Sequence, residues 1–366
     1  MNILLLEPYF TGSHRSWAEG YKKHSNHDIT ILSLPGRFWK WRMHGGSVTL
    51  SKEFAKLEDS FEIILASDML DLTTFLSLTR KWTSHISTAV YFHENQLSYP
   101  WSPDDRDILE KRDKHYGFIN FTSALTADRV FFNSEYHRTS FLSELPRLLK
   151  HFPDYNELDS VKEIELKSSV LHLGLDLKRF DDYPSKKKDT PIILWNHRWE
   201  YDKNPKGFFR LLNTLAENGP EFKLVILGEN FSESPHEFQE NIKILGDKIL
   251  HVGYEESFKE YAHWLWKSDI LPVTSIQDFF GASIMEAVYC GCHPILPEKL
   301  TYPELFPSEY LYRDEEELYE KTVLALNQVQ SIRKNTLKNT AAVYDWEIMA
   351  SEYDSIFTNL RNKPIE

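Results

Sequence analysis

The chain has few cysteines, no long apolar segment and no excess of positive charge. Its two cysteines, Cys290 and Cys292, are close neighbours in a predicted helix end, so we expect reduced core thiols and neither a disulfide nor a metal site. No run approaches about 20 uncharged apolar residues, which argues against a transmembrane helix. The chain holds 42 Lys and Arg against 55 Asp and Glu. A net charge of −13 argues against a general nucleic-acid coat protein.

The first residues also lack the features of a signal peptide. Residues 1–7 carry no basic stretch before the apolar run and reach an acid at Glu7. This order predicts a strand, and we expect a cytoplasmic protein. The sequence shows no internal repeat or low-complexity tract.

Two series of apolar runs alternate with amphipathic stretches, a pattern typical of parallel α/β domains. With 366 residues and 41% apolar content, the chain is long enough for two such domains. Residues 183–190 between the two series are polar and contain a proline, as linkers often do. We therefore expect one domain over residues 1–185 and a second over residues 186–345.

The first apolar run, residues 3–6, is followed by a predicted loop over residues 8–14 and a helix from residue 17. Gly12 and Ser13 are the pliable part of this loop. His14 either contacts an acceptor or lies on the surface without a function.

A second polar group follows the predicted strand at residues 88–92. It consists of His93, Glu94, Asn95 and Gln96. Because open α/β sheets bind ligands at the carboxyl ends of their strands, we favour a functional His93 over one that only holds a loop.

Basic and aromatic residues alternate between residues 35 and 46. The candidate acceptor-binding residues of this segment are Arg37, Trp39, Lys40, Trp41 and Arg42. Such a segment can stack exposed bases and pair with phosphates. The alternative is a loop whose tryptophans pack on the core while the cations remain in water.

Charge is distributed unevenly along the chain. Residues 1–180 hold 22 basic and 24 acidic residues, whereas residues 181–366 hold 20 and 31. If a polyanion binds, we expect the first half to contact it.

In the second half, Arg198 and Lys203 follow an apolar run at residues 191–195. A planar guanidinium and an ammonium at the end of a strand can bind a diphosphate. Gly228 ends the next predicted strand and lets backbone approach a ligand. Tyr254 ends a further predicted strand, at residues 249–254.

The segment from Asp278 to Glu286 contains a short predicted helix that starts at Gly281. The N–H groups of Gly281, Ala282 and Ser283 would lie at the helix N-terminus, where a diphosphate is stabilised. The two carboxylates suit the hydroxyl groups of a hexose and a ribose. A plain amphipathic helix with one buried acid is the alternative.

These segments resemble known motifs. An acid, seven residues and a glutamate, with Phe280 and Gly281 between them, resemble the donor motif of retaining GT-B glycosyltransferases, although that family usually has Glu where this chain has Asp278. The segments EPYFTGSH, YFHENQLSYP, LPGRFWKWRMHGG, HRWEYDKNP, LGENF, HVGY and FFGASIMEAVYCGC together resemble the tRNA-queuosine mannosyltransferase family within that group.

The resemblance implies a GT-B fold of two facing Rossmann-like domains with an interdomain cleft, the first completed by a C-terminal helix over residues 346–366. It implies transfer of mannose from GDP-mannose to queuosine at the wobble position of tRNA-Asp, with retention and without a metal or other cofactor. The partners would be tRNA and a nucleotide sugar, with no membrane.

The motifs and the resemblance together assign site residues in three groups. The catalytic group is His93, Arg198, Lys203 and Asp278. The nucleotide-sugar group is Gly228, Tyr254, Phe280, Gly281, Ala282, Ser283 and Glu286. The acceptor group is Gly12, Ser13, His14, Arg37, Trp39, Lys40, Trp41, Arg42, Asn95 and Gln96.

Three other functions share part of this pattern. One is a retaining GT-B glycosyltransferase that uses another nucleotide sugar on a glycan or lipid. The second is a tRNA-binding protein without catalysis. The third is a GT-B-shaped sugar-nucleotide epimerase, for which tRNA would be irrelevant.

Overall fold

A computed structural model describes residues 1–102, 107, 115–228 and 236–361, and it divides the chain into two compact units. The first unit comprises Met1–Leu175 with Trp346–Glu366, and the second comprises Asp176–Asp345. Among the described residues, no helix is long and apolar enough to cross a bilayer. Cys290 and Cys292 are both free and buried, which confirms the expected core thiols.

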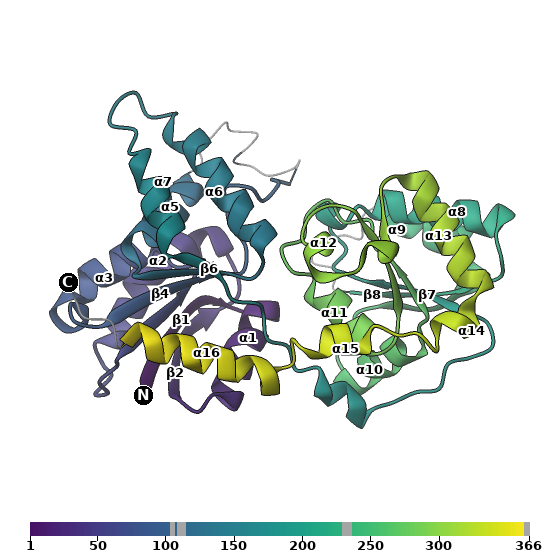
Figure 1. The fold of residues 1–366 in the computed structure, drawn as a ribbon, viewed down its shortest axis with the longest axis horizontal. Helices are drawn as coiled ribbons and strands as arrows, with labels where there is room; N and C mark the ends of the chain where they lie inside the picture. Colours follow the sequence, from purple (N-terminus) through teal and green to yellow (C-terminus); the bar gives the residue numbers. More distant parts are fainter. Residues whose placement is uncertain (103–106, 108–114, 229–235, 362–366) are drawn as a thin grey trace. The chain divides into compact units, whose positions relative to one another are not determined.

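The first unit contains a parallel six-stranded sheet in the order β2-β1-β3-β4-β5-β6 (Figure 1). Its strands are β1 (Asn2–Phe10), β2 (Asp28–Pro35), β3 (Ile63–Ser67), β4 (Ser87–Phe92), β5 (Arg129–Phe132) and β6 (Ser168–Val170). Its helices are α1 (Gly12–His24), α2 (Trp39–Phe54), α3 (Leu72–Thr83), α5 (His115–Thr126), α6 (Glu135–Leu149), α7 (Asp159–Lys167) and α16 (Trp346–Arg361).

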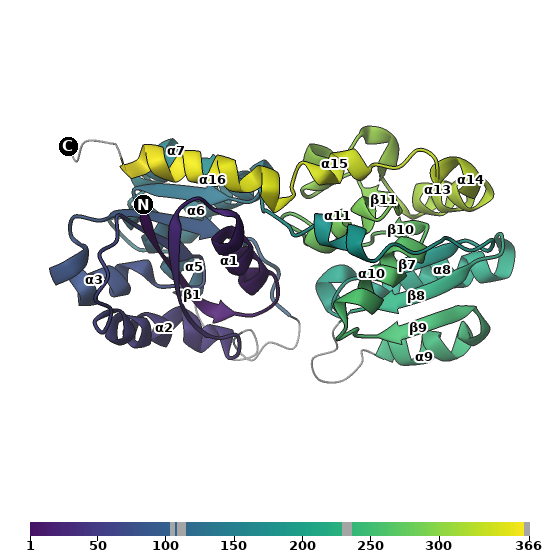
Figure 2. The same ribbon diagram turned by 90° about the horizontal axis from the view of Figure 1, so that it is seen from below.

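Successive residues of each strand point to opposite faces, so both faces of this sheet are apolar and covered. Phe92 and Phe132 stack at 4.9 Å within the core beneath α2, α3, α5, α6 and α7. Tyr91 lies on the other face, with Trp17 of α1 stacked on it at 4.8 Å. Helices α1 and α16 are in contact on that face (Figure 2).

The second unit repeats the design with the sheet order β12-β11-β10-β7-β8-β9. Its strands are β7 (Ile192–Asn196), β8 (Lys223–Leu227), β9 (Ile249–Gly253), β10 (Ile270–Pro272), β11 (His293–Pro297) and β12 (Leu311–Tyr312). Its main helices are α8 (Pro205–Asn218), α9 (His236–Ile244), α10 (Phe258–Lys267), α11 (Ala282–Tyr289), α12 (Tyr302–Leu305), α13 (Glu315–Asn327), α14 (Val329–Ile332) and α15 (Lys338–Ala342). The short 3-10 helices in the described part of this unit are η1 (Lys178–Asp182), η2 (Tyr201–Lys203), η3 (Gly246–Lys248) and η4 (Ser308–Tyr310).

Each sheet has a point where the chain leaves adjacent strands in opposite directions. In the first unit this point lies between the paired strands β1 and β3, and in the second between β7 and β10. Ligands of open α/β sheets bind outside the carboxyl ends of such strand pairs. Ligand-binding residues are therefore expected in the loops after β1, β3, β7 and β10.

Two local predictions are wrong. The predicted loop over residues 8–14 is mostly regular, because β1 pairs with β2 as far as Phe10 and α1 begins at Gly12. The segment at residues 35–46 is helical from Trp39 onward. Helix α2 was missed because its first turns carry exposed aromatics and two adjacent glycines, which weaken the helical pattern.

Helix α16 is held to the rest of the first unit by a tight fit around Trp346. A Cβ placed on Gly20 of α1 would lie 2.0 Å from the Trp346 indole, and one on Gly174 would lie 2.4 Å from it. The backbone N–H of Trp346 also donates a hydrogen bond to the Leu175 carbonyl at 2.9 Å. The two glycines therefore leave the space that the indole occupies.

We predict that Gly20→Ala destabilises the protein, although alanine is the better helix former. Overpacking against the indole costs about 1–3 kcal/mol, which exceeds the roughly 0.5–1 kcal/mol gained in helix propensity. Urea unfolding measures the change. Gly246→Ala is the control, because a Cβ there meets nothing within 4 Å. An unchanged or higher midpoint for Gly20→Ala would contradict the packing argument.

Candidate active site

In the second unit, the loop after β7 lies against the start of α11. The Asn196 side chain donates to the Ser283 carbonyl at 2.8 Å, and the Ser283 hydroxyl lies 3.3 Å from Nδ1 of His197. A Cβ on Gly228 would lie 1.9 Å from the His197 carbonyl oxygen. Because Gly228 has no Cβ, the backbone of His197 can pack directly against it. The end of β8 therefore lies beside this loop.

Lys203 and Asp278 form the charged centre of this region. The Lys203 ammonium lies 3.4 Å from Asp278 Oδ2 and 3.2 Å from Asp202 Oδ2, and it donates to the Gln277 carbonyl at 3.0 Å. Burial lowers the pKa of Lys203, but Asp278 and Asp202 outweigh this effect and raise it. Tyr302 also donates to Asp278 at 2.9 Å. The cation is therefore permanent and is held in place by carboxylates.

Glu286 points from α11 toward α10. It accepts a 2.5 Å hydrogen bond from the Tyr261 hydroxyl, and Tyr261 also bonds to Asn196. Burial raises the pKa of Glu286 to about 7, while the bond from Tyr261 acts to lower it. Tyr261 and Asn196 thus link Glu286 to the loop after β7, in which Arg198 follows.

The remaining residues predicted to bind the nucleotide sugar differ in how far they are exposed to solvent. Arg198 is 47% exposed and lies 3.3 Å from Glu200. Gly281, with a φ of 83°, is the N-cap residue of α11 and, as a glycine, has no side chain to cap the first turn. Phe280 is buried, with its ring packed edge-on against Tyr344, whereas Tyr254 is exposed on the surface.

In the first unit, a buried polar cluster lies at the ends of β1, β3 and β4. His14 Nδ1 is 2.9 Å from Glu7 Oε2, and the His14 ring lies 4.2 Å from the His93 ring. The His93 backbone N–H donates to Asp68 at 2.8 Å. Among the described residues, neither His93 Nε2 nor Asp68 Oδ2 has a hydrogen-bond partner.

The two histidines of this cluster differ in their protonation at neutral pH. Burial lowers the pKa of His14, but the Glu7 carboxylate outweighs it and raises the pKa to about 9. Burial raises the pKa of Asp68 to about 8. Burial and the neighbouring His14 lower the pKa of His93 well below its usual value. At neutral pH the cluster therefore presents an imidazolium at His14 and a neutral imidazole at His93.

The predicted acceptor residues separate into buried and exposed groups. Asn95 and Gln96 are buried, and they shape the loop after β4: Asn95 accepts from the Ser98 N–H, and the Gln96 N–H donates to Asn120. The Trp39 ring packs on Tyr116 at 5.1 Å, and Lys40 pairs with Asp107 at 2.5 Å. The exposed or partly exposed members are Gly12, Ser13, Arg37, Trp41 and Arg42.

Comparison with known proteins identifies the family. The model described as tRNA-queuosine alpha-mannosyltransferase N-terminal matches residues 2–175, and that described as Glycosyl transferases group 1 matches residues 178–319. A curated Drosophila melanogaster protein, tRNA-queuosine alpha-mannosyltransferase, is 37% identical over 87% of this chain and 85% of its own. The chain belongs to the tRNA-queuosine α-mannosyltransferase family.

Solved structures support the fold. The N-terminal domain of Candida albicans trehalose-6-phosphate phosphatase matches with a TM-score of 0.72 and 13% identity, over 98% of this chain and 97% of that chain. Sucrose-phosphate synthase from Thermosynechococcus elongatus matches with a TM-score of 0.68 and 14% identity, over 98% and 99%. The protein is a glycosyltransferase with the predicted GT-B fold of two Rossmann-like units.

Several residues of these clusters were missed in the sequence. Glu7 directly follows the apolar run of residues 3–6, and Asp68 directly follows β3, so the rule that drew attention to His93 would also have found them. Tyr261 gave no such signal, because it lies within a helix, and only the folded chain brings it to Glu286. Asp202 precedes Lys203 in the segment after β7, but only the structure shows that the two side chains pair.

One set among the described residues has the spacing of a metal site. Potential ligand atoms of Glu7, His14 and His93 all lie within 4.8 Å of one another. The ion pair between Glu7 and His14 accounts for two of the three without a metal. Through this ion pair, the cluster holds a proton on His14.

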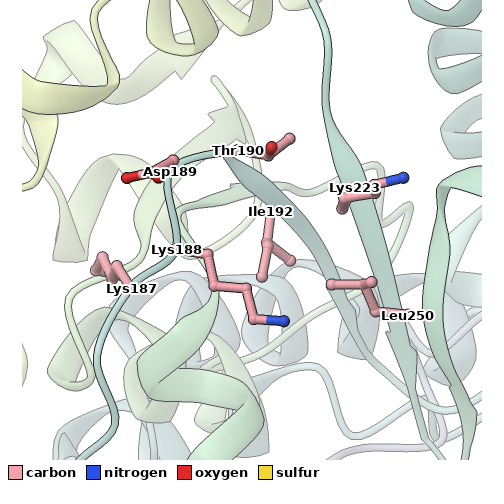
Figure 3. Close-up of a pocket in the computed structure, with 7 residues that line it drawn as sticks. All are labelled: Lys187, Lys188, Asp189, Thr190, Ile192, Lys223 and Leu250. Atoms are coloured by element: carbon pink, nitrogen blue, oxygen red, sulfur yellow. The ribbon is translucent and has the colours of Figure 1, made fainter.

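A hollow of about 480 Å³ lies at the amino-terminal ends of strands β7 and β8 in the second sheet (Figure 3). Its lining includes Ile192 and Lys223, the first residues of β7 and β8. Arg198 and Lys203 follow the opposite, carboxyl end of β7. This hollow is thus separate from the candidate site.

We predict that Glu7→Gln lowers the pKa of His14, because the variant removes the carboxylate that keeps the imidazolium charged. The folded-state pKa of about 9 exceeds the usual 6.5, so the charge stabilises the fold below pH 6.5 and this contribution is lost as pH rises toward 9. NMR titration of the His14 ring measures the change. Glu94→Gln should lower the pKa less, since Glu94 contributes only a weaker charge interaction. Equal shifts in both variants would refute the role of Glu7.

Proposed function

We propose that this enzyme transfers mannose from GDP-mannose to queuosine at the wobble position of tRNA-Asp. The observation that carries the proposal is the 37% identity to a tRNA-queuosine alpha-mannosyltransferase over most of both chains. The match of the N-terminal family model to residues 2–175 supports the choice of acceptor, because that unit holds the predicted acceptor residues. The low identity of the solved neighbours carries no argument about the donor.

In this proposal the second unit binds the nucleotide sugar. The diphosphate contacts Arg198 and the N–H groups at the start of α11, where the helix dipole favours an anion. Glu286 accepts hydrogen bonds from the ribose hydroxyls, and Asp278 from mannose. Lys203 offsets part of the negative charge of Asp278, 3.4 Å away, and adds its own positive charge to that of Arg198.

The bond that breaks joins the anomeric carbon to the diphosphate oxygen. Negative charge then grows on the departing GDP, and Arg198, Lys203 and the α11 N-terminus stabilise it without a metal. Asp278 is a poor nucleophile, because Tyr302 donates to its Oδ2 and Lys203 lies 3.4 Å from the same oxygen. The proposal therefore has the acceptor hydroxyl attack from the side of the leaving diphosphate, with retention. The proton of that hydroxyl passes to the diphosphate.

The deciding experiment is mass spectrometry of nucleosides from queuosine-containing tRNA-Asp incubated with the enzyme and GDP-mannose. A queuosine nucleoside heavier by one hexose is the expected product. UDP-sugars in place of GDP-mannose, and tRNA without queuosine, are the two controls. Transfer from UDP-sugars but not from GDP-mannose would contradict the donor, and transfer to tRNA without queuosine would contradict the acceptor.

We predict that Arg198→Ala lowers kcat/KM on the order of 10- to 100-fold, because a charged contact to the leaving group is lost. Arg198 is half-exposed, so the fold should be unaffected. Lys206→Ala is the matched control, since Lys206 is an exposed cation at the start of α8. Steady-state transfer rates decide the matter, and equal rates for the two variants would remove Arg198 from the mechanism.

We also predict that the affinity for GDP-mannose weakens as the pH falls through about 7, since a protonated Glu286 accepts ribose hydroxyls poorly. Tyr261→Phe removes the bond that lowers this pKa, so the midpoint should move to higher pH. Tyr289→Phe is the control, because the Tyr289 hydroxyl bonds to Asp181 instead. Calorimetric titration on both sides of pH 7 gives the midpoints. A midpoint unmoved by Tyr261→Phe would separate Glu286 from donor binding.

A further inference from the structure

The N-terminal turn of α2 exposes two aromatic rings. Phe38 is 72% exposed and Trp41 is 63% exposed, whereas Trp39 between them packs inward on Tyr116. Lys40 also faces inward, within 5.4 Å of the Trp101 ring centroid. The segment thus divides its side chains between an internal support and an external surface.

The backbone at Phe38 is strained, and the Trp41 ring is packed on one face. Phe38 has a φ of 59° and a ψ of 53°, a left-handed conformation that a residue with a side chain adopts only under constraint. A Cβ on Gly45 would lie 2.5 Å from the Trp41 ring, so the ring rests on the bare backbone of the next helical turn. One face of Trp41 is packed there, and 63% of the residue remains open.

The segment that carries these rings is itself positively charged. The Arg37 guanidinium lies 5.8 Å from the Phe38 ring centroid, and Arg42 donates to the Pro35 carbonyl at 3.1 Å. No Asp or Glu occurs between Asp28 and Glu53, although acids outnumber bases in the whole chain. A surface with open aromatic faces and cations but no acid of its own segment suits a polyanion with exposed bases.

This surface lies close to the buried cluster of the same unit. Trp39 packs in a small core with Met69, the residue after Asp68, and with Tyr9. The Tyr9 ring in turn lies 5.9 Å from the His14 ring. The inner side of the α2 turn therefore supports the loops after β1 and β3, and its outer side carries Phe38 and Trp41.

We propose that Phe38 and Trp41 stack on unpaired nucleobases of the RNA loop that carries the acceptor nucleoside. This inference rests on the proposed function and adds the way in which the loop is recognised. Stacking needs open base faces, so the enzyme prefers a single-stranded loop to a duplex, and it prefers the loop to the isolated nucleoside. Arg37 and Arg42 contact the phosphates on either side. Trp39 and Lys40 do not touch RNA in this arrangement.

The test compares KM for queuosine-containing tRNA with KM for the free queuosine nucleoside. Phe38→Gly and Trp41→Ala should each raise KM for tRNA on the order of tenfold, because one stacking ring is lost. KM for the nucleoside and for GDP-mannose should stay unchanged. Gly45→Ala should act in the same direction as Trp41→Ala, since its Cβ displaces the indole.

Matched controls come from the same unit. Tyr155 is also an aromatic residue with a positive φ, 45°, and it is 87% exposed. Trp82 is a partly exposed tryptophan with Lys81 beside its ring at 5.4 Å. Tyr155→Gly and Trp82→Ala should leave KM for tRNA unchanged.

Stability gives a second, independent measurement. Phe38→Gly removes a side chain from a left-handed position, so its urea midpoint should rise while its affinity for tRNA falls. A purely structural role for Phe38 would instead lower both or leave the affinity unchanged. Absence of transfer to tRNA by the unmodified enzyme would refute the proposed function itself. Normal transfer with an unchanged KM in Phe38→Gly and Trp41→Ala, or equal losses in the controls, would overturn only the stacking inference.

Discussion

Parallel pairing of β1 with β3, and of β7 with β10, is the constraint on which both clusters depend. Hydrogen bonding in register brings the carboxyl ends of paired strands to the same edge of the sheet. The crossovers then leave in opposite directions and keep helices away from that edge. This pairing brings together residues far apart in sequence, such as Glu7 and Asp68 or Lys203 and Asp278.

Each cluster keeps buried charge by pairing it. Lys203 lies between two carboxylates, and His14 is paired with Glu7. Isolated charges at these positions would be expensive to bury, whereas paired ones persist and stay oriented. Such fixed charge is suited to a reaction in which charge develops at a known position, because little reorganisation is needed when it appears.

The two exposed rings on α2 show a related principle. Phe38 occupies an unfavourable backbone conformation while its neighbours Trp39 and Lys40 are well packed. The packed residues fix the turn, and the fixed turn keeps Phe38 outward. A segment that alternates between inward and outward aromatic residues can thus present a rigid surface, which lowers the entropy lost when a flexible RNA loop binds.

The sequence by itself determined the α/β class, the two strand series and the family, because apolar runs and turn residues are local signals that survive without tertiary context. It also indicated Arg198, Lys203, Asp278 and Glu286, since each lies just after a strand or within a helix that starts there. Only the tertiary structure decided their partners. Tyr261 donates a hydrogen bond to Glu286, which lies 25 residues away in the sequence. The His197 carbonyl lies so close to Gly228 that no Cβ would fit there.

The same limit applies to the aromatic segment. Composition grouped Trp39, Lys40 and Trp41 together, and only the helix separated them into inward and outward sides. Successive residues of a helix point about 100° apart. Neighbours in the sequence therefore differ in burial, and the direction of each side chain is known only once the helix is packed against its sheet.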